Sequence, residues 1–597
     1  MTPIDWIIIA VYMVGCTVAG LWMQRYVRNV ADFAVAGRKM EVNLGVASLA
    51  ATELGIVTVM YTAQMGFQNG LTGALPGILT AAAMLIVGLT GFVIVPLRNA
   101  GVMTIPELFE NRFGKRVRWL AGLVIIIGGV LNMGVFLRMG GDFLLNITGM
   151  DSQRTFLLDL WGWQFELKTL ELVMTGLLGI VLVYTVLGGM LSVLITDYLQ
   201  FLVMGLGIVV TSVLVVCNAG GTGFLAELEN AHQSGQRYQD KEEEPQKDRI
   251  KKEVAAVRES EGREAAGALR ERQRTEYGQS LKARAEELAK QGVLVDTAKK
   301  EKPPTAETMK HPFNPVKNQN QGIPWILWQA LTSIAVVTTW QTTIARVLAA
   351  RDAQTAKRVY RGAWFYWVGR WCLPGLWGAA AFCYFAAHGG LPDGIGSETA
   401  MPRFLGLTLS STFTGFLGLM IAAMLAAEMS TDSGYLLTWA TVIYNDLIGP
   451  VLRRPLSERA RLLTVRAMVL AIGVFLVFWG LWYKIPGNIW EYLVITGNIY
   501  LASLFALLVG ALYWRGANSW GAMAAIVLGA AGPITFLIVN AIVDEDSSWR
   551  ISGELGGLAA FGLAFAGMIV GSLVGRATGR AIARPIQTTA ETEEPGP

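Results

Sequence analysis

The chain is 597 residues long; 53% of its residues are hydrophobic and only 16% are charged, a balance that excludes an ordinary soluble domain. Its formal net charge of +4 is small and dispersed, which argues against a nucleic-acid partner. The cysteines lack metal-ligand spacing, so the sequence predicts neither a disulfide framework nor a zinc site. The composition favours a protein that crosses a lipid bilayer many times.

Apolar stretches long enough to cross a bilayer recur along most of the sequence. A hydrocarbon core of about 30 Å requires about 20 apolar residues in a helix. The first stretch begins at Ile4 without a basic leader or a cleavage site, so we expect a retained helix and no signal peptide. Reading the apolar stretches against the charged connections predicts about thirteen transmembrane helices, near residues 4–24, 43–66, 73–97, 118–137, 169–187, 191–217, 324–348, 362–387, 413–443, 466–483, 488–513, 519–543 and 553–574.

Basic residues gather on alternate connections between these helices. The connections after the first, third, seventh, ninth, eleventh and thirteenth helices carry most of the Lys and Arg of the short connections. Because connections rich in Lys and Arg stay in the cytoplasm, we expect a periplasmic N-terminus and a cytoplasmic C-terminus in a bacterial inner membrane.

One connection, residues 228–322, is long and rich in charges of both signs. Long loops translocate largely regardless of charge, so we expect this soluble insert in the periplasm. A thin apolar stripe predicts a solvated helix, with docking of a periplasmic partner as the alternative; it consists of Ile250, Val254, Val257 and Leu269. The chain then divides into a first transmembrane part at 1–227, the insert at 228–322, a second transmembrane part at 323–575 and a cytoplasmic tail at 576–597.

The second expected helix contains polar residues in the middle of the bilayer. Ions bind in transporters where a helix is broken and its carbonyl groups are freed, or where hydroxyl groups face inward. The sequence Thr52-Glu53-Leu54-Gly55 interrupts the apolar run and is typical of a discontinuous helix. A continuous helix with one buried acid that is paired elsewhere is the alternative.

The ninth expected helix carries hydroxyl groups and acids on separate faces. At about 100° per residue, Ala427, Ser430 and Thr431 share one face, whereas Glu428 and Asp432 share another. An isolated hydroxyl often bonds back to its own helix. Two acids in one turn favour a functional site, because ionisable residues are costly at this depth.

Several segments resemble those of the sodium/solute symporter family, which includes sodium-coupled sugar, proline and sialic acid transporters. The resemblance spans about 1–227 and 323–575 and is carried by Tyr184 to Ser192, Thr196-Asp197-Tyr198-Leu199-Gln200, Ala427 to Ser433, Asp32-Phe33 to Gly37-Arg38, Gln341 to Arg351, and Gly510 to Ala522. It departs at Gly516, where the family usually has a basic residue. The resemblance implies an all-α membrane protein whose core is an inverted five-plus-five helix repeat with discontinuous first and sixth core helices.

The resemblance also implies a sodium ion as cofactor. Its expected ligands are three backbone carbonyls and two hydroxyl groups, namely those of Ala51, Leu54, Ala427, Ser430 and Thr431. Oxygen ligands of this kind suit a hard cation. Some members bind a second ion with an acid and hydroxyls that correspond to Asp197 and Ser433, but Gly434 replaces one hydroxyl here. We therefore expect one sodium per cycle, with Asp197 orienting an inner gate; a secondary-ion or proton role for Asp197 is the alternative.

The expected substrate is a small organic solute of the sugar, amino-acid or carboxylate class. The resemblance places seven residues along its pathway: Glu53, Thr58, Trp340, Gln341, Thr342, Tyr492 and Asn498. The polar positions that sugar-transporting members use are largely absent. The sequence leaves three alternative roles open for Glu53 and Glu428: pairing with Arg346 or Arg370, accepting a cationic group of the solute, or carrying a proton.

Three alternatives to sodium symport stay open on the sequence. A proton on Glu53, Glu428 or Asp432 could replace sodium as the coupling ion, or the fold could serve a transporter-like membrane sensor. An enzyme is disfavoured, because no nucleophile with its base and no metal-ligand cluster is visible in the sequence.

Overall fold

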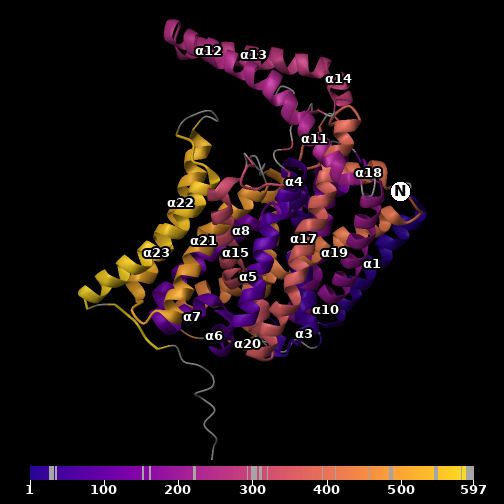
Figure 1. The fold of residues 1–597 in the computed structure, drawn as a ribbon. Helices are drawn as coiled ribbons and strands as arrows, with labels where there is room; N and C mark the ends of the chain where they lie inside the picture. The colour runs from indigo at the N-terminus through magenta and orange to yellow at the C-terminus, as the bar shows by residue number, and fades with distance from the viewer. Residues whose placement is uncertain are drawn as a thin grey trace, which may run out of the picture.

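The computed structural model is a bundle of long helices with a helical projection at one end (Figure 1). It describes residues 1–23, 25, 33, 36–150, 154–160, 163–218, 223–291, 293–296, 305–307, 309, 312–318, 321–392, 394–410, 412–452, 454, 456–482, 489–543, 549–579 and 581–585. The expected motif residue Asp32 and most of the expected tail lie outside this described part.

The first transmembrane part contains one leading helix and the helices of the first repeat. Its helices are α1 (Pro3–Met23), α3 (Val42–Glu53), α4 (Ile56–Asn69), α5 (Leu75–Thr90), α6 (Ile94–Asn99), α7 (Ile105–Phe113), α8 (Lys115–Met133), α9 (Phe136–Thr148) and α10 (Thr169–Asn218). Strands β1 (Thr155–Leu160) and β2 (Trp163–Lys168) form an antiparallel hairpin before α10.

The helices of this part differ from the expected ones in two places. The fourth helix was expected to stop near 137, but α9 continues the chain in helical form to Thr148. Within α9, Arg138 and Asp142 form an i,i+4 ion pair with 3.9 Å between Nε and Oδ2. The expected fifth and sixth helices are the two arms of α10, separated by a kink at Gly189 with φ 55°. A β-carbon at Gly189 would lie 2.5 Å from the Phe33 ring, so only glycine fits this turn.

The second transmembrane part repeats the pattern of short and long helices. Its helices are α15 (Gly322–Thr339), α16 (Gln341–Ala349), α17 (Ala353–Ala387), α18 (Ala400–Thr408), α19 (Phe416–Val442), α20 (Glu458–Trp482), α21 (Ile489–Tyr513), α22 (Ser519–Ile542) and α23 (Gly553–Ala577). Helix α19 lies at the centre, because all but one of its residues are buried.

Ten stretches of the described chain are long and apolar enough to cross a membrane. Two of them, Ile56–Thr90 and Thr169–Asn218, each contain parts of two expected helices. The expected helix near 362–387 is α17, which is less apolar because it contains Arg370, Pro374 and several tryptophans and glycines. The predicted fold class, an all-α membrane protein with discontinuous helices, is confirmed.

The charged insert is helical rather than extended. It forms α11 (Phe224–Tyr238), α12 (Glu244–Ser260), α13 (Arg263–Ala283), α14 (Ala285–Lys290) and the antiparallel strands β3 (Leu294–Asp296) and β4 (Thr305–Glu307). Helices α12 and α13 run side by side away from the bundle (Figure 1). No residue of α12 is buried, which fits the expected solvated helix, but the expected stripe is divided, because the chain turns at Gly262 (φ 95°) and Leu269 lies on α13.

Candidate functional site

The second transmembrane helix is broken where the sequence predicted. Helix α3 ends at Glu53, Leu54 has φ −107° and ψ 67°, and α4 begins at Ile56 after the extended Gly55. The Leu54 amide donates to the carbonyl of Ala51 at 3.3 Å. Because the normal helical ladder stops here, carbonyl groups at the end of α3 become available to other partners.

Helix α19 packs directly against this break. The Thr431 hydroxyl donates to the carbonyl oxygen of Thr52 at 2.9 Å. A β-carbon at Gly55 would lie only 2.7 Å from the Thr431 oxygen, so the approach requires glycine. The Ser430 hydroxyl donates to Asp197 on α10 at 2.5 Å. Both hydroxyls therefore face other helices, which excludes the alternative that they only bond back to α19.

The remaining expected ion ligands lie in the same buried region. The side chains of Ala51, Leu54 and Ala427 are at most 1% exposed. Ser433 instead donates to the carbonyl of Ser430 at 3.1 Å, within its own helix. The structure thus brings α3 and α19 together at Thr52 and Thr431, and Thr52 follows the expected ligand Ala51 in the chain.

Asp197 is the centre of a polar network that joins four helices. Its carboxylate accepts hydrogen bonds from Ser48 at 2.5 Å and from Thr52 at 3.2 Å, in addition to the bond from Ser430. Its partner is Arg346 on α16, 3.3 Å away. Arg346 also donates to Thr52, to Ser48 at 3.2 Å and to the carbonyl of Thr342 at 3.1 Å. The sequence had left Arg346 as a partner for Glu53 or Glu428, whereas the structure pairs it with Asp197.

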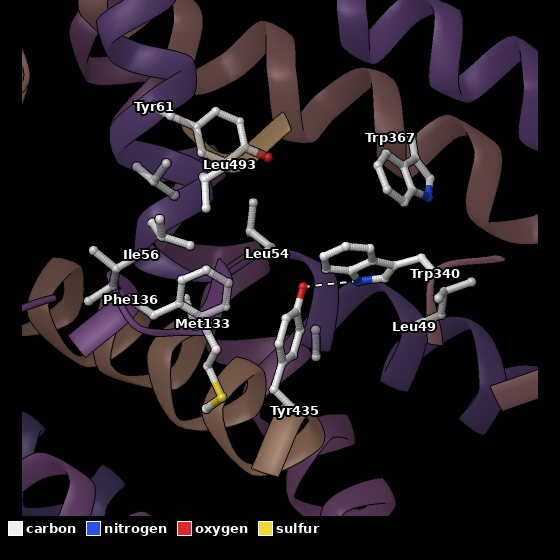
Figure 2. Close-up of a cluster of buried hydrophobic side chains, with 14 of the residues drawn as sticks. Leu49, Leu54, Ile56, Tyr61, Met133, Phe136, Trp340, Trp367, Tyr435 and Leu493 are labelled. Atoms are coloured by element: carbon white, nitrogen blue, oxygen red, sulfur yellow. Dashed lines mark hydrogen bonds between the residues drawn. The ribbon is translucent and has the colours of Figure 1, made fainter. Parts of the chain in front are cut away.

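The seventh transmembrane helix is also broken, at Trp340 between α15 and α16. Trp340 has ψ 115°, and its indole donates to the hydroxyl of Tyr435 on α19 at 3.1 Å, as Figure 2 shows. Just after the break, the hydroxyls of Thr342 and Thr343 donate to Glu53 Oε1 at 2.8 and 2.9 Å. Glu53 therefore connects the two broken helices.

The other carboxylate oxygen of Glu53 faces α17. Its Oε2 lies 3.6 Å from Arg370 Nη1. The Nη2 group of Arg370 donates to Tyr61 at 2.8 Å and to Thr58 at 3.2 Å. The guanidinium lies over the Trp367 ring, 4.2 Å from its centroid. Of the two arginines considered from the sequence, Arg370 is the partner of Glu53.

A cavity of about 90 Å³ lies between the broken helices. Its lining residues are Thr52, Glu53, Val57, Thr58, Tyr61, Pro76, Thr80, Asn132, Phe136, Gln329, Thr332, Ser333, Val336, Trp340, Trp367, Arg370, Trp371, Thr431, Tyr435, Trp490, Leu493, Val494 and Leu501. Figure 2 shows Tyr61, Trp367, Trp340 and Tyr435 from different helices in this region.

Three of the seven expected pathway residues line this cavity: Glu53, Thr58 and Trp340. The other four do not. Thr342 donates to Glu53, Tyr492 donates to the carbonyl of Leu131 at 3.0 Å, and Gln341 and Asn498 are buried outside the lining.

Sequence reasoning did not find most of the lining residues. One signal was available on α15, where Gln329, Thr332 and Ser333 at i, i+3 and i+4 form a polar stripe on an apolar span. The aromatic residues of α17 gave no such signal, because aromatic residues occur on all faces of that helix.

Glu428 and Asp432 are buried on α19 near the same break. Both Glu428 carboxylate oxygens and Asp432 Oδ2 lack a hydrogen-bond partner among the described residues. The Ile56 amide, at the start of α4, lies close to the Glu428 carboxylate. No cluster of three or more His, Cys, Asp or Glu able to hold a metal ion occurs in the described chain.

Two discontinuous helices that line one cavity are typical of secondary transporters of the inverted-repeat type. The family model described as "Sodium:solute symporter family" matches residues 33–258 and 277–529. The match covers most of the chain, and the protein belongs to this family. It also extends further into the insert, from both sides, than the resemblance had indicated.

Individual relatives support the same assignment. The chain is 30% identical over 236 residues to the sodium/glucose cotransporter 1 of Ovis aries, a match that covers 38% of this chain and 32% of that protein. The chain spans only 30–38% of the length of the first five curated relatives. Similarity to the high-affinity proline transporter PutP of Bacillus subtilis is lower, 23%, but covers 86% of this chain and 88% of that protein.

A solved structure shares the fold over nearly the whole length. It shows a Na⁺-coupled sialic acid symporter in a substrate-bound outward-open state, with a TM-score of 0.67 and 14% identity, covering 98% of this chain and 99% of that one. The protein is thus a multi-pass membrane protein of a transporter family, as the sequence predicted.

Proposed function

We propose that this protein is a sodium-coupled symporter of a small organic solute in a bacterial inner membrane. The contact between Thr431 on α19 and the Thr52 carbonyl at the break of α3 carries the proposal. Both the family assignment and the contact support sodium as the coupling ion. The insert lies in the periplasm in this proposal, and the C-terminus lies in the cytoplasm.

The proposed ion ligands are the carbonyls of Ala51, Leu54 and Ala427 and the hydroxyls of Ser430 and Thr431. These neutral oxygens fit a hard monovalent cation, and a site without a ligating carboxylate binds it weakly enough to allow release. The two hydroxyls already sit within hydrogen-bonding distance of oxygens on α3 and α10. When bound, sodium supplies positive charge that holds α3 and α19 together.

Coupling follows from the difference in ion affinity between two arrangements of these helices. An arrangement with α3 against α19 binds sodium better, so sodium shifts the population toward it and alternating access follows. At roughly 100 mV the membrane potential contributes about 2.3 kcal/mol per charge, and a tenfold sodium gradient adds about 1.4 kcal/mol. One ion per cycle would then support solute accumulation of roughly a few hundredfold.

The test is the effect of sodium on the thermal stability of the purified protein in detergent. A ligand that binds the folded state raises the melting temperature, so NaCl should raise it relative to choline chloride. The double variant Ser430→Ala/Thr431→Ala should lose this effect. The double variant Thr438→Ala/Thr441→Ala is the matched control, because both hydroxyls bond back to the same helix at 2.7 and 2.8 Å.

The proposal is wrong if the wild-type protein shows no sodium effect. It is also wrong if the Ser430/Thr431 variant keeps the whole effect.

Proton coupling is the second candidate, and the geometry of Glu428 and Asp432 favours it. Two buried acids with three unpartnered oxygens cannot both be ionised at low cost, so a proton on one of them is the simplest neutralisation. Proteoliposomes with a pH gradient and no sodium would then accumulate solute, and Glu428→Gln with Asp432→Asn would abolish this accumulation. Accumulation that requires a sodium gradient would exclude this candidate.

A further inference from the structure

Among the described residues that line the cavity, only Glu53 and Arg370 are charged. Both side chains are about 95% buried. The two groups are not equally committed to other partners. Because a buried ion without its full set of hydrogen bonds is costly, the less committed group is the one that a ligand would engage.

Glu53 is held in place by its neighbours. One oxygen accepts the two threonine hydroxyls from α16, and the other faces Arg370. This carboxylate therefore joins the two broken helices through Oε1, while its Oε2 faces the charge of Arg370.

Arg370 keeps unused donors. Its Nε and Nη1 groups have no hydrogen-bond acceptor among the described residues, and the 3.6 Å separation from Glu53 is too long for a hydrogen bond. The Trp367 ring beneath the guanidinium and the two bonds of Nη2 fix its position. A fixed, buried arginine with free N–H groups is suited to receive a carboxylate.

The other unsatisfied polar groups of the cavity are also donors or hydroxyls. Gln329 Nε2, the Thr332 hydroxyl and Trp371 Nε1 lack partners within the described structure, although all three residues are buried. Donors that converge on one cavity favour a ligand rich in acceptor oxygens. A neutral sugar would supply both donors and acceptors, so it matches this set less well.

Charge balance points in the same direction, and this step rests on the proposed function. Glu53 neutralises Arg370, and the cavity shares Thr52 and Thr431 with the proposed ion site. With the buried acids Glu428 and Asp432 both protonated, sodium at that site adds one net positive charge to a buried region. A solute with a single negative charge restores neutrality, which gives sodium and solute a reason to bind together.

The rest of the cavity wall combines aromatic, aliphatic and a few polar side chains. Tyr61, Trp371 and Trp490 form an aromatic cluster with ring centroids 4.7–5.3 Å apart. A second aromatic group contains Trp340 and Tyr435, 5.8 Å apart, and Phe136, 5.1 Å from Tyr435; Figure 2 labels these three residues. Such walls suit an apolar or ring-shaped body rather than a chain of hydroxyl groups.

We propose that the cavity binds a small monocarboxylate with an apolar or aromatic body, and that Arg370 receives its carboxylate.

The test compares acids with their neutral amides on the purified full-length protein in NaCl. The probe pairs are benzoate and benzamide, phenylacetate and phenylacetamide, and indole-3-acetate and indole-3-acetamide. At least one acid should stabilise the protein in a thermal shift assay, and its amide should bind about ten- to hundredfold more weakly because it lacks the charged hydrogen bond.

Variants distinguish a role of Arg370 in binding the carboxylate from an effect of the substitution on folding. Arg370→Gln should remove the preference for the acid, and Glu53→Gln/Arg370→Gln should do so without leaving a lone buried charge. The matched control is Arg358→Gln, which makes the same change at an exposed position on α17 and should keep the preference.

The outcomes distinguish this inference from the proposed function. If sodium stabilises the protein but no acid is preferred over its amide, the carboxylate assignment is overturned and the ion site stands. An acid preference that persists without sodium supports Arg370 and contradicts sodium coupling. Retention of the preference by both Arg370 variants overturns the role of that residue.

Discussion

Arg346 and Asp197 form an ion pair inside the helical bundle, 3.3 Å apart, with side chains that are 1% and 0% exposed. The pair joins α16 to α10, and its hydrogen bonds extend to Ser48 and Thr52 on α3 and to Ser430 on α19. Because these helices belong to both transmembrane parts, the pair holds together elements that would move relative to one another in the proposed alternating-access cycle.

Removing one member of this pair should destabilise the protein strongly. Asp197→Asn or Arg346→Met leaves the other charge buried and unpaired, which costs about 3–5 kcal/mol. The double variant should recover part of this loss. Thermal or denaturant melting in detergent measures it.

The surface pair Arg351–Glu41 is the matched control, with 2.6 Å between its charged atoms and both side chains more than half exposed. The variant Arg351→Gln should change stability by about 0–1 kcal/mol. Equal losses for the buried and the exposed pair would contradict the role assigned to Asp197 and Arg346.

Gly55→Ala should weaken the sodium effect by steric means alone. Gly55 has φ −74°, so alanine brings no backbone strain, but its β-carbon would lie 2.7 Å from the Thr431 oxygen. The helices must move apart, at a cost of about 1–3 kcal/mol. We expect a smaller sodium-induced shift in melting temperature.

Gly205→Ala on α10 serves for comparison, because nothing lies within 4 Å of its added β-carbon. This change should leave the sodium effect intact and stabilise the helix by up to about 1 kcal/mol. A Gly55 variant with wild-type sodium response would show that the contact with Thr431 is not needed for ion binding.

The residues alone were sufficient to predict the break between α3 and α4, whereas the break at Trp340 was expected only from the family resemblance. A glycine and an acid at Glu53-Leu54-Gly55, inside an apolar run, conflict with a continuous buried helix, and the structure resolves the conflict by ending α3 there. The hydroxyl face of α19 was also predictable, because its polar residues recur at the helical period.

The pairing of the buried charges was not predictable from local patterns. Arg346 and Asp197 are 149 residues apart, and which acid each arginine meets depends on how the two halves of the chain pack. The residues that line the cavity could not be predicted from the sequence for a related reason. On α17 the cavity-facing Trp367 and Trp371 look the same in sequence as the exposed Phe365, so only packing tells them apart.

Asp352 at the start of α17 should make stability depend on pH in the acid range. Its carboxylate accepts the Thr355 amide at 2.6 Å as an N-cap, and this bond lowers the pKa of Asp352 below its ordinary value. A lowered pKa means that the ionised form stabilises the folded protein. The contribution is present above about pH 4 and is lost as the pH falls through the folded-state pKa.

Asp352→Ala should therefore cost about 0.5–2 kcal/mol at neutral pH, and the difference from wild type should shrink as the pH is lowered from 5 to 3. Asp352→Asn keeps a capping oxygen without the charge, so it should stay close to wild type at neutral pH and lack this contribution to the pH dependence. A loss for Asp352→Ala that does not change with pH would contradict the charged cap.

The α12–α13 hairpin should be dispensable for the stability of the membrane bundle. No residue of α12 is buried, Ala266 is the one buried residue of α13 between 263 and 272, and the hairpin projects away from the bundle (Figure 1). Surface residues of this kind contribute little to stability. Replacing residues 254–272 by a short Gly-Ser loop should therefore leave the melting temperature and the sodium effect unchanged.

The base of the insert should behave in the opposite way. Leu228 on α11 is 0% exposed and belongs to the main hydrophobic core, and the nearby His232 ring contacts the Met309 carbonyl at 2.8 Å. Leu228→Ala should therefore destabilise the protein by about 2–5 kcal/mol. If the shortened hairpin lost as much stability as Leu228→Ala, the hairpin would have to contact the bundle or a second copy of the chain, and its size-exclusion profile would then differ from that of the wild type.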